Sequence, residues 1–408
     1  MRILILLAIA AYPLAAQLLP TAPPEQVGLS KDRIARIKPV QEKYVANGQL
    51  AGGVMIIARK GKVAYFDTFG KLDKDGSKPM PKDAIFRLYS MTKPIVTVAA
   101  LTLYEEGKFS MLDPVSKFIP EFSKMSVMTK TGLVPAEKPI SIMDLMRHTW
   151  GQNNQGPRDA NGGLVFSRSD ARHQTLEEGI KTMAAAPLVH QPGTGFDYSP
   201  GPDVVGRLIE IWSGKPLDVY LEETIFKPLH MVDTGFWVPE AKWSRIATLY
   251  DGGPKGELIK ATDEAQEGYK QKPTFLSGSG GLASTATDYL RFAQMLLNGG
   301  ELDGVRLLSP KSVDLMSADL LGSLPIYGGP VVPGYGFGLT VAVNRGPAAT
   351  ASIGSAGEYY WEGAASSIFF VDPKEKLLTV YMIQKRRGVS ISREYKRMVY
   401  QTITQEEK

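Results

Sequence analysis

Residues 86–94, Phe-Arg-Leu-Tyr-Ser-Met-Thr-Lys-Pro, lead directly into an apolar run over residues 95–104. This run is apolar on nearly every side, which predicts a buried helix. Proline fits only the first turn of a helix, so Pro94 predicts where this helix begins. Ser90 is then expected at the helix N-terminus, and Lys93 lies one turn further along the same face.

This spacing suits nucleophilic catalysis. A serine hydroxyl is a poor nucleophile until a neighbour removes its proton, and a lysine can do so only as a neutral amine. Burial and the positive end of the helix dipole both disfavour the ammonium form of Lys93. The backbone N–H of Ser90 would also face a developing oxyanion. The alternative interpretation is a serine N-cap followed by an exposed lysine. Ser90 and Lys93 form the only Ser-x-x-Lys match in the chain.

The composition is that of a globular protein. The chain has 408 residues, 43% hydrophobic and 22% charged, which predicts one large domain or two interleaved domains. The net charge of +5 comes from scattered residues and gives no case for nucleic-acid binding. The absence of cysteine excludes disulfides, thiol catalysis, cysteine zinc sites and a lipid-modified cysteine.

A basic cluster lies near the C-terminus. We expect it to form a solvated face near a terminal helix, and a polyanion or membrane-surface role is the alternative. The cluster comprises Lys385, Arg386, Arg387, Arg393, Lys396 and Arg397.

Residues 1–16 resemble a signal peptide. A charged start, Met1-Arg2, precedes an apolar stretch that ends in small residues, including Ala15-Ala16. The apolar stretch is shorter than the roughly 20 residues that a spanning helix needs. We therefore expect export to the periplasm or the medium, with no stable membrane span in the mature chain.

Strand patterns occur at both ends of the chain and helix patterns between them. Residues 52–59 and 62–69 are predicted to form a hairpin, and residues 338–344, 366–372 and 377–384 further strands. Helices are predicted over residues 30–47, 142–148, 175–186, 202–212, 217–225, 285–297 and 389–404. Residues 187–202 are rich in proline and glycine and are expected to form a loop that carries Tyr198.

This order predicts an α+β fold. An antiparallel sheet would be built from both termini, with a mostly helical insertion. We expect an α/β domain from residues 17–80 and 275–408, and a helical domain with active-site loops from residues 81–274.

Several motifs together resemble the class C β-lactamase superfamily, most closely its carboxylesterase branch, the family VIII esterases. The resemblance spans roughly residues 25–400 and implies a β-lactamase/transpeptidase-like fold. In chain order the motifs are Tyr89-Ser90-Met91-Thr92-Lys93, Arg147-His148-Thr149, Pro192-Gly193 leading to Tyr198-Ser199, Gly280-Gly281-Leu282, and Trp361-Glu362-Gly363-Ala364.

The resemblance implies roles for individual residues. Ser90 would be the acylated nucleophile, and Lys93 and Tyr198 would share the proton transfers. The backbone N–H groups of Ser90 and Ala364 would form the oxyanion hole. The expected substrate-binding residues are Tyr89, Trp361 and Gly363. No metal and no cofactor are expected.

Two departures from the lactamase pattern affect the expected substrate. Tyr198 is followed by Ser199-Pro200, so the asparagine amide that would bind an acylamide side chain is missing. Trp361 stands where lactamases have a cation for the substrate carboxylate, and a charge-assisted hydrogen bond is worth about 1.5–3 kcal/mol. Both departures favour neutral esters. Glu362 leaves the charge near the site open.

Other hydrolase patterns are missing from the sequence. No serine lies in a Gly-x-Ser-x-Gly elbow, and no His-Glu-x-x-His motif occurs among the four dispersed histidines, of which His148 is expected to anchor a turn.

We therefore expect a serine hydrolase that acts on short-chain carboxylic esters. The alternatives are a β-lactamase or D-alanyl-D-alanine carboxypeptidase, an acyltransferase, and a penicillin-binding sensor. The sequence does not determine the natural substrate or the oligomeric state.

Overall fold

The computed structural model describes residues 17–156, 158–159, 163–164, 173–386 and 392–407. The predicted signal peptide, residues 1–16, lies outside this part of the chain. So does Arg387 of the basic cluster, together with the start of the predicted terminal helix. No helix within the described ranges combines the length and the apolarity that crossing a bilayer requires.

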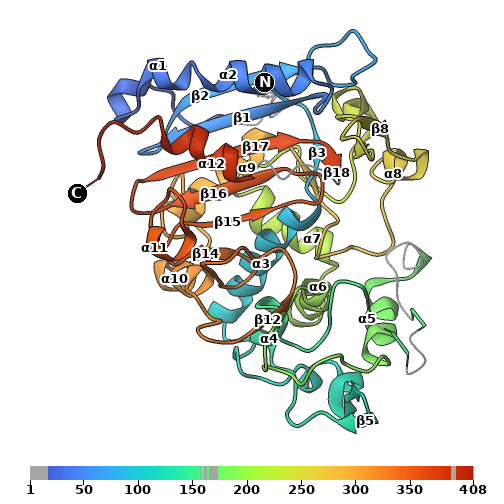
Figure 1. Cartoon of the computed structure of the whole chain (residues 1–408). Helices are drawn as coiled ribbons and strands as arrows, with labels where there is room; N and C mark the ends of the chain where they lie inside the picture. The colour runs from blue at the N-terminus through green and yellow to red at the C-terminus, as the bar shows by residue number, and fades with distance from the viewer. Residues whose placement is uncertain (1–16, 157, 160–162, 165–172, 387–391, 408) are drawn as a thin grey trace, which may run out of the picture.

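A seven-stranded antiparallel sheet joins the two ends of the described chain (Figure 1). The N-terminal hairpin forms one edge and pairs with the last long strand, so the predicted α+β fold with a sheet from both termini is confirmed. In spatial order the strands are β13 (Tyr335–Phe337), β14 (Ala342–Asn344), β15 (Tyr359–Glu362), β16 (Ile368–Asp372), β17 (Leu377–Ile383), β1 (Gly52–Arg59) and β2 (Lys62–Gly70).

Helices cover the sheet, and most of them lie in sequence between its N-terminal strands, β1 and β2, and its C-terminal strands, β13 to β17. They are α1 (Lys31–Ile34), α2 (Ile37–Ala46), α3 (Thr92–Glu105), α4 (Ile142–Met146), α5 (Leu176–Ala184), α6 (Gly201–Ser213), α7 (Leu217–Leu221), α8 (Asp263–Glu267), α9 (Ala286–Leu297), α10 (Pro310–Ser317), α11 (Pro347–Thr350) and α12 (Ser392–Tyr400). Helix α3 is buried on nearly all sides and packs against α6, as its apolar sequence predicts.

Short strands form the remaining sheets. They are β3 (Phe86–Arg87) with β9 (Ala283–Ser284), β4 (Ser126–Thr129) with β5 (Gly132–Pro135), β6 (Phe196–Asp197) with β12 (Ile326–Gly328), β10 (Glu301–Leu302) with β11 (Val305–Arg306), and β7 (Tyr250–Gly252) between β8 (Leu258–Lys260) and β18 (Lys385–Arg386).

The two faces of the large sheet pack against different helices. Phe369 of β16 contacts Tyr289 of α9, whereas the next residue, Phe370, contacts Tyr395 of α12. Alternate side chains of a strand point to opposite faces. Because Trp361 pairs with Phe369, it lies on the α9 face of the sheet.

Four element predictions need correction. Residues 338–344 are not one strand: Thr340 has a left-handed φ of 62°, which turns the chain between β13 and β14. Residues 30–47 form two helices, α1 and α2. The helix predicted over residues 217–225 becomes a π-helix at Glu222–Phe226, and the terminal helix ends at Tyr400.

The basic cluster is only partly solvated. Lys385 and Lys396 are buried, contrary to the prediction, whereas Arg397 is exposed. The Lys396 ammonium binds the Glu358 carboxylate between α12 and the sheet, and the Lys385 ammonium donates to a backbone carbonyl oxygen. Arg386 is half-buried in an ion pair with a carboxylate. The sequence pattern could not separate the buried members of the cluster from the exposed ones, because the carboxylate and carbonyl groups that bind the buried lysines come from distant segments.

Candidate active site

Ser90 lies in a 3₁₀ turn, Tyr89–Met91, that leads directly into α3. The helix begins at Thr92, two positions before Pro94. Proline is compatible with this start because the N–H groups of the first turn need no helical partner. The Thr92 hydroxyl accepts a hydrogen bond from the backbone N–H of Leu282, which attaches the start of the helix to the glycine-rich segment.

Lys93 points back toward Ser90. Its side chain is only 1% exposed. The Lys93 Nζ donates hydrogen bonds to Ser90 Oγ at 3.1 Å and to the carbonyl oxygen of Ser279 at 2.5 Å. The Ser279 carbonyl thus holds the amine within reach of the serine hydroxyl.

Tyr198 approaches Ser90 from a distant loop. Its hydroxyl donates to Ser90 Oγ at 2.7 Å, and its ring centroid lies 4.8 Å from Lys93 Nζ. The backbone N–H of Tyr198 donates to Gly328 O, which ties the tyrosine to β12. The structure therefore brings the three predicted catalytic side chains together.

Tyr89 has a left-handed backbone, with φ of 46°. For a bulky residue this conformation costs about 1–3 kcal/mol and persists only where the surroundings hold it. The half-buried Tyr89 ring packs against the small cluster of Leu249, Ala261 and Ala365. Burial raises the pKa of the Tyr89 phenol, and the neighbouring Arg386 opposes this shift.

The end of β15 runs directly against the segment that carries Ser90. A Cβ on Gly363 would come within 2.3 Å of the Leu88 carbonyl oxygen, so only glycine fits here. Ala364, which follows Gly363, is exposed. The two residues expected to supply the oxyanion-hole N–H groups, Ser90 and Ala364, thus belong to two segments whose backbones meet at Gly363.

The Trp361 side chain is buried, at 1% exposed. It packs against the rings of Tyr198 and Phe337, with centroids 5.5 and 5.1 Å away. Within the described residues its indole N–H has no hydrogen-bond partner. The contact with Trp361 limits the positions that the Tyr198 ring can occupy.

Glu362 lies on the opposite face of β15 from Trp361, because successive strand residues alternate. Burial raises the pKa of the Glu362 carboxyl, and the ammonium of Lys396 in α12 opposes this shift. The side chain is therefore on the α12 side of the sheet, away from the face that carries Trp361.

A buried network behind Tyr198 was not predicted from the sequence. Ser199 Oγ accepts a hydrogen bond from Trp150 Nε1 at 2.7 Å and lies 3.0 Å from His148 Nδ1. Burial, followed by the charge of Lys93, lowers the pKa of His148 well below its ordinary value, so the imidazole is neutral. Its ring centroid lies 4.7 Å from that of Tyr198. The Arg147-His148-Thr149 motif indicated this region. Ser199 is distant from His148 in sequence, so the motif did not predict the contact between them.

Comparison with known proteins identifies the family of this chain. The profile of the family described as Beta-lactamase matches residues 37–399, and the chain therefore belongs to the β-lactamase family of serine hydrolases. This confirms the superfamily that the motifs resemble.

Individual relatives extend the comparison. Protein Rv1367c of Mycobacterium tuberculosis is 35% identical over 362 residues, which cover 84% of this chain and 88% of the relative. Esterase EstB of Burkholderia gladioli is 31% identical over 360 residues, which cover 83% and 87%. The solved structure of EstCE1, described as a hydrolase with promiscuous acyltransferase activity, has a TM-score of 0.74 and 25% identity, and the match covers 92% of this chain and 99% of that one.

Proposed function

We propose that this protein hydrolyses short-chain carboxylic esters through an acyl-enzyme on Ser90, in the manner of the family VIII esterases. The observation that supports this most strongly is the convergence of Lys93 Nζ and Tyr198 OH on Ser90 Oγ, at 3.1 and 2.7 Å. A serine hydroxyl becomes an effective nucleophile when a neighbouring base takes its proton.

In the proposed first step, Ser90 Oγ attacks the ester carbonyl carbon, and the Lys93 and Tyr198 pair takes the serine proton. The negative charge on the carbonyl oxygen would face the backbone N–H groups of Ser90 and Ala364. The alcohol leaves with a proton returned through Tyr198. Water then attacks the acyl group with the same pair acting as base, which releases the carboxylic acid and free Ser90.

Two features of the site support a neutral ester as the substrate. The position at which lactamases have a cation is occupied by the buried Trp361, so an anionic substrate loses that partner. The Ser199 hydroxyl interacts with His148 and Trp150 and supplies no amide for an acylamide side chain. The similarity to the esterase EstB is consistent with this choice.

A β-lactamase or D-alanyl-D-alanine carboxypeptidase activity is the second candidate, because the matching family is described as Beta-lactamase. The comparison of p-nitrophenyl butyrate with nitrocefin separates these candidates. We expect a much larger kcat/KM for the ester, and faster nitrocefin cleavage would overturn the esterase assignment.

Acyl transfer and simple binding are tested in the same preparation. Mass spectrometry after ester treatment should show a rapid return to the free mass, whereas a persistent adduct on Ser90 would indicate a binding module. The promiscuous acyltransferase activity ascribed to EstCE1 makes acyl transfer a further candidate. New ester product in the presence of added alcohol would reveal it.

We also infer export, which rests on the leader-like residues 1–16. Fractionation of expressing cells should place the protein in the periplasm or the medium. N-terminal sequencing of the exported protein should show that the leader has been removed, and an intact leader in the cytoplasm would contradict the inference.

A further inference from the structure

His148 occupies a position where glycine is usual. It follows α4 and the C-cap residue Arg147, and its backbone is left-handed, with φ of 57°. The backbone N–H of the next residue, Thr149, donates to the carbonyl oxygen of Asp144, which gives the hydrogen-bond pattern of a Schellman motif. Glycine would form this helix end without strain, so the turn alone does not require an imidazole.

The main chain on both sides of Tyr198 is hydrogen-bonded to this histidine. The backbone N–H of Asp197 donates to the His148 carbonyl oxygen at 2.9 Å. The backbone N–H of Ser199 donates to Nδ1 of the His148 ring at 3.2 Å. His148 therefore fixes the backbone from which the Tyr198 side chain extends.

The imidazole of His148 also contacts the Tyr198 side chain. The two ring centroids are 4.7 Å apart, and the ring planes are tilted by 55°. Phe196 and Phe337 pack edge-on against the same imidazole, with centroids 5.7 and 5.5 Å away. An imidazole held among three aromatic rings has little room to move, so it limits where the Tyr198 ring can lie.

The hydrogen bonds determine which nitrogen of the His148 ring carries the proton. A backbone N–H can only donate, so Nδ1 accepts from Ser199, and in the neutral ring the proton is on Nε2. In the part of the chain that the structure describes, Nε2 has no hydrogen-bond partner, although the side chain is fully buried. A buried donor without a partner costs stability and requires an explanation. The contacts that His148 makes around Tyr198 supply one.

We propose that His148 is a positioning residue, which holds the Tyr198 phenol on Ser90 through the main chain on both sides of the tyrosine. The Nδ1 lone pair is the essential feature of the ring, because it accepts the N–H that follows Tyr198. A displacement of the phenol by about 1 Å is enough to lower the rate about 10²-fold. This role rests on the proposed function, in which Tyr198 transfers protons. It assigns His148 no contact with the substrate and no proton transfer.

Two substitutions of similar shape test the Nδ1 contact. Asparagine adopts a left-handed backbone readily and has an acceptor, Oδ1, bonded to Cγ as Nδ1 is, so His148→Asn keeps an acceptor for the Ser199 N–H. His148→Leu places a methyl group there instead. Both variants lose the ring contact, so the difference between them reports the acceptor. We expect kcat for p-nitrophenyl butyrate to be about 10²-fold lower in His148→Leu than in His148→Asn, with similar KM values.

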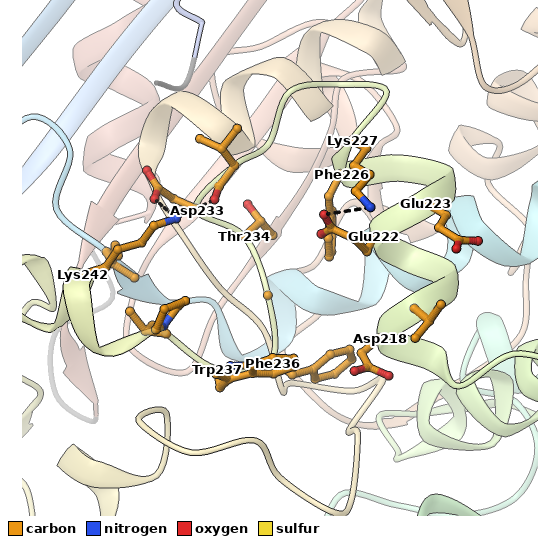
Figure 2. A pocket seen from close by; sticks show the side chains of 16 residues that line it. Asp218, Glu222, Glu223, Phe226, Lys227, Asp233, Thr234, Phe236, Trp237 and Lys242 are labelled. Atoms are coloured by element: carbon orange, nitrogen blue, oxygen red, sulfur yellow. Dashed lines mark hydrogen bonds and ion pairs between the residues drawn. The ribbon is translucent and has the colours of Figure 1, made fainter. Parts of the chain in front are cut away.

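The control for backbone strain is His230→Leu. His230 is also left-handed, with φ of 54°. It lies in the chain between Lys227 and Val232, which line a cavity of about 420 Å³ apart from the three candidate catalytic residues (Figure 2). We expect its kcat to match that of the unmodified protein. A kcat that falls equally in His148→Leu and His230→Leu, or that is equally low in the two His148 variants, would overturn the proposal.

Crystal structures of the two His148 variants give a second measurement, which requires no turnover. The distance from the Tyr198 hydroxyl to Ser90 Oγ should stay near 2.7 Å in His148→Asn and exceed hydrogen-bond distance in His148→Leu. An unchanged distance in His148→Leu would show that His148 does not hold the phenol. If His148→Leu does not fold, His148→Gly removes the same acceptor without backbone strain and carries the same expectation.

The two measurements also separate this role from the proposed function. If the unmodified protein cleaves no ester but the Tyr198 hydroxyl still moves away from Ser90 in His148→Leu, the esterase assignment fails and the positioning by His148 stands. If the unmodified protein cleaves the ester and His148→Leu retains both kcat and the 2.7 Å contact, the positioning role fails and the esterase assignment stands.

Discussion

The Tyr198 hydroxyl donates a hydrogen bond to Ser90 Oγ at 2.7 Å, although 108 residues separate the two in sequence. The Lys93 amine reaches the same oxygen from within the helix that follows Ser90. A group from the adjoining helix and a group from a distant loop therefore meet on one hydroxyl. If the proposed mechanism holds, neither group should be dispensable.

The first prediction concerns Ser90 and Lys93. Ser90→Ala and Lys93→Ala should each lower kcat for p-nitrophenyl butyrate by roughly 10⁴-fold, and the double variant should be no worse than either single variant. Residues that act as one catalytic unit lose activity in this non-additive way. Steady-state kinetics measure the effect, and thermal unfolding shows whether each variant is folded. A folded Ser90→Ala protein with near-full activity would exclude the assigned nucleophile.

The second prediction concerns the Tyr198 phenol. Tyr198→Phe keeps the ring that packs against Trp361 and His148 but removes the hydroxyl that contacts Ser90. We expect kcat to fall by about 10²–10⁴-fold, as for the loss of a proton-transfer group, with little change in Tm. Unchanged kcat in a folded variant would mean that Lys93 alone suffices.

The third prediction uses the contact between Gly363 and Leu88. In Gly363→Ala the new methyl group would approach the Leu88 carbonyl oxygen to 2.3 Å, so the segment before Ser90 must shift. We expect a loss of about 1–3 kcal/mol in the free energy of unfolding and a marked loss of kcat. The control is Gly76→Ala, whose methyl group would meet only Asp73 atoms at 3.5 Å. If both variants behave like the unmodified protein in urea unfolding and in the esterase assay, the close approach does not hold the site.

The fourth prediction concerns Asp288, which is buried near the start of α9. Burial raises the pKa of its carboxyl to about 7, compared with about 3.9 in an unfolded chain. The folded state therefore retains a proton that the unfolded state releases. The resulting stabilisation is complete below about pH 4 and is lost as the pH rises through about 7.

Asp288→Asn has no carboxyl to ionise and should not show this loss. The free energy of unfolding of the variant, relative to the unmodified protein, should therefore increase from pH 5 to pH 8. Urea unfolding at several pH values measures this difference. A difference that does not vary with pH would mean that Asp288 does not titrate in this range.

Local patterns predicted much of the fold and the central pair of the site. The apolar run before residue 105 indicated α3, and the spacing of Ser90 and Lys93 placed them one turn apart. The β1–β2 hairpin was predicted because Lys60-Gly61 suits a tight turn, and both residues have positive φ. These features depend on neighbours in the chain, so the sequence contains the information they need.

Other features depend on contacts between distant segments. The motifs suggested Tyr198, but only the folded chain brings its hydroxyl to Ser90. The interaction of Ser199 with His148 and the burial of Lys396 were not predicted. Each of them requires partners more than 35 residues away in sequence.

The sequence by itself therefore determined the sheet from both termini, the buried helix and the serine with a lysine one turn away, since helical and strand periodicities act over a few residues. Only the tertiary structure decided which side chains meet Ser90, which face of β15 carries Trp361, and which charges are buried. Burial and contact arise when separate segments pack, and no local pattern specifies the partner.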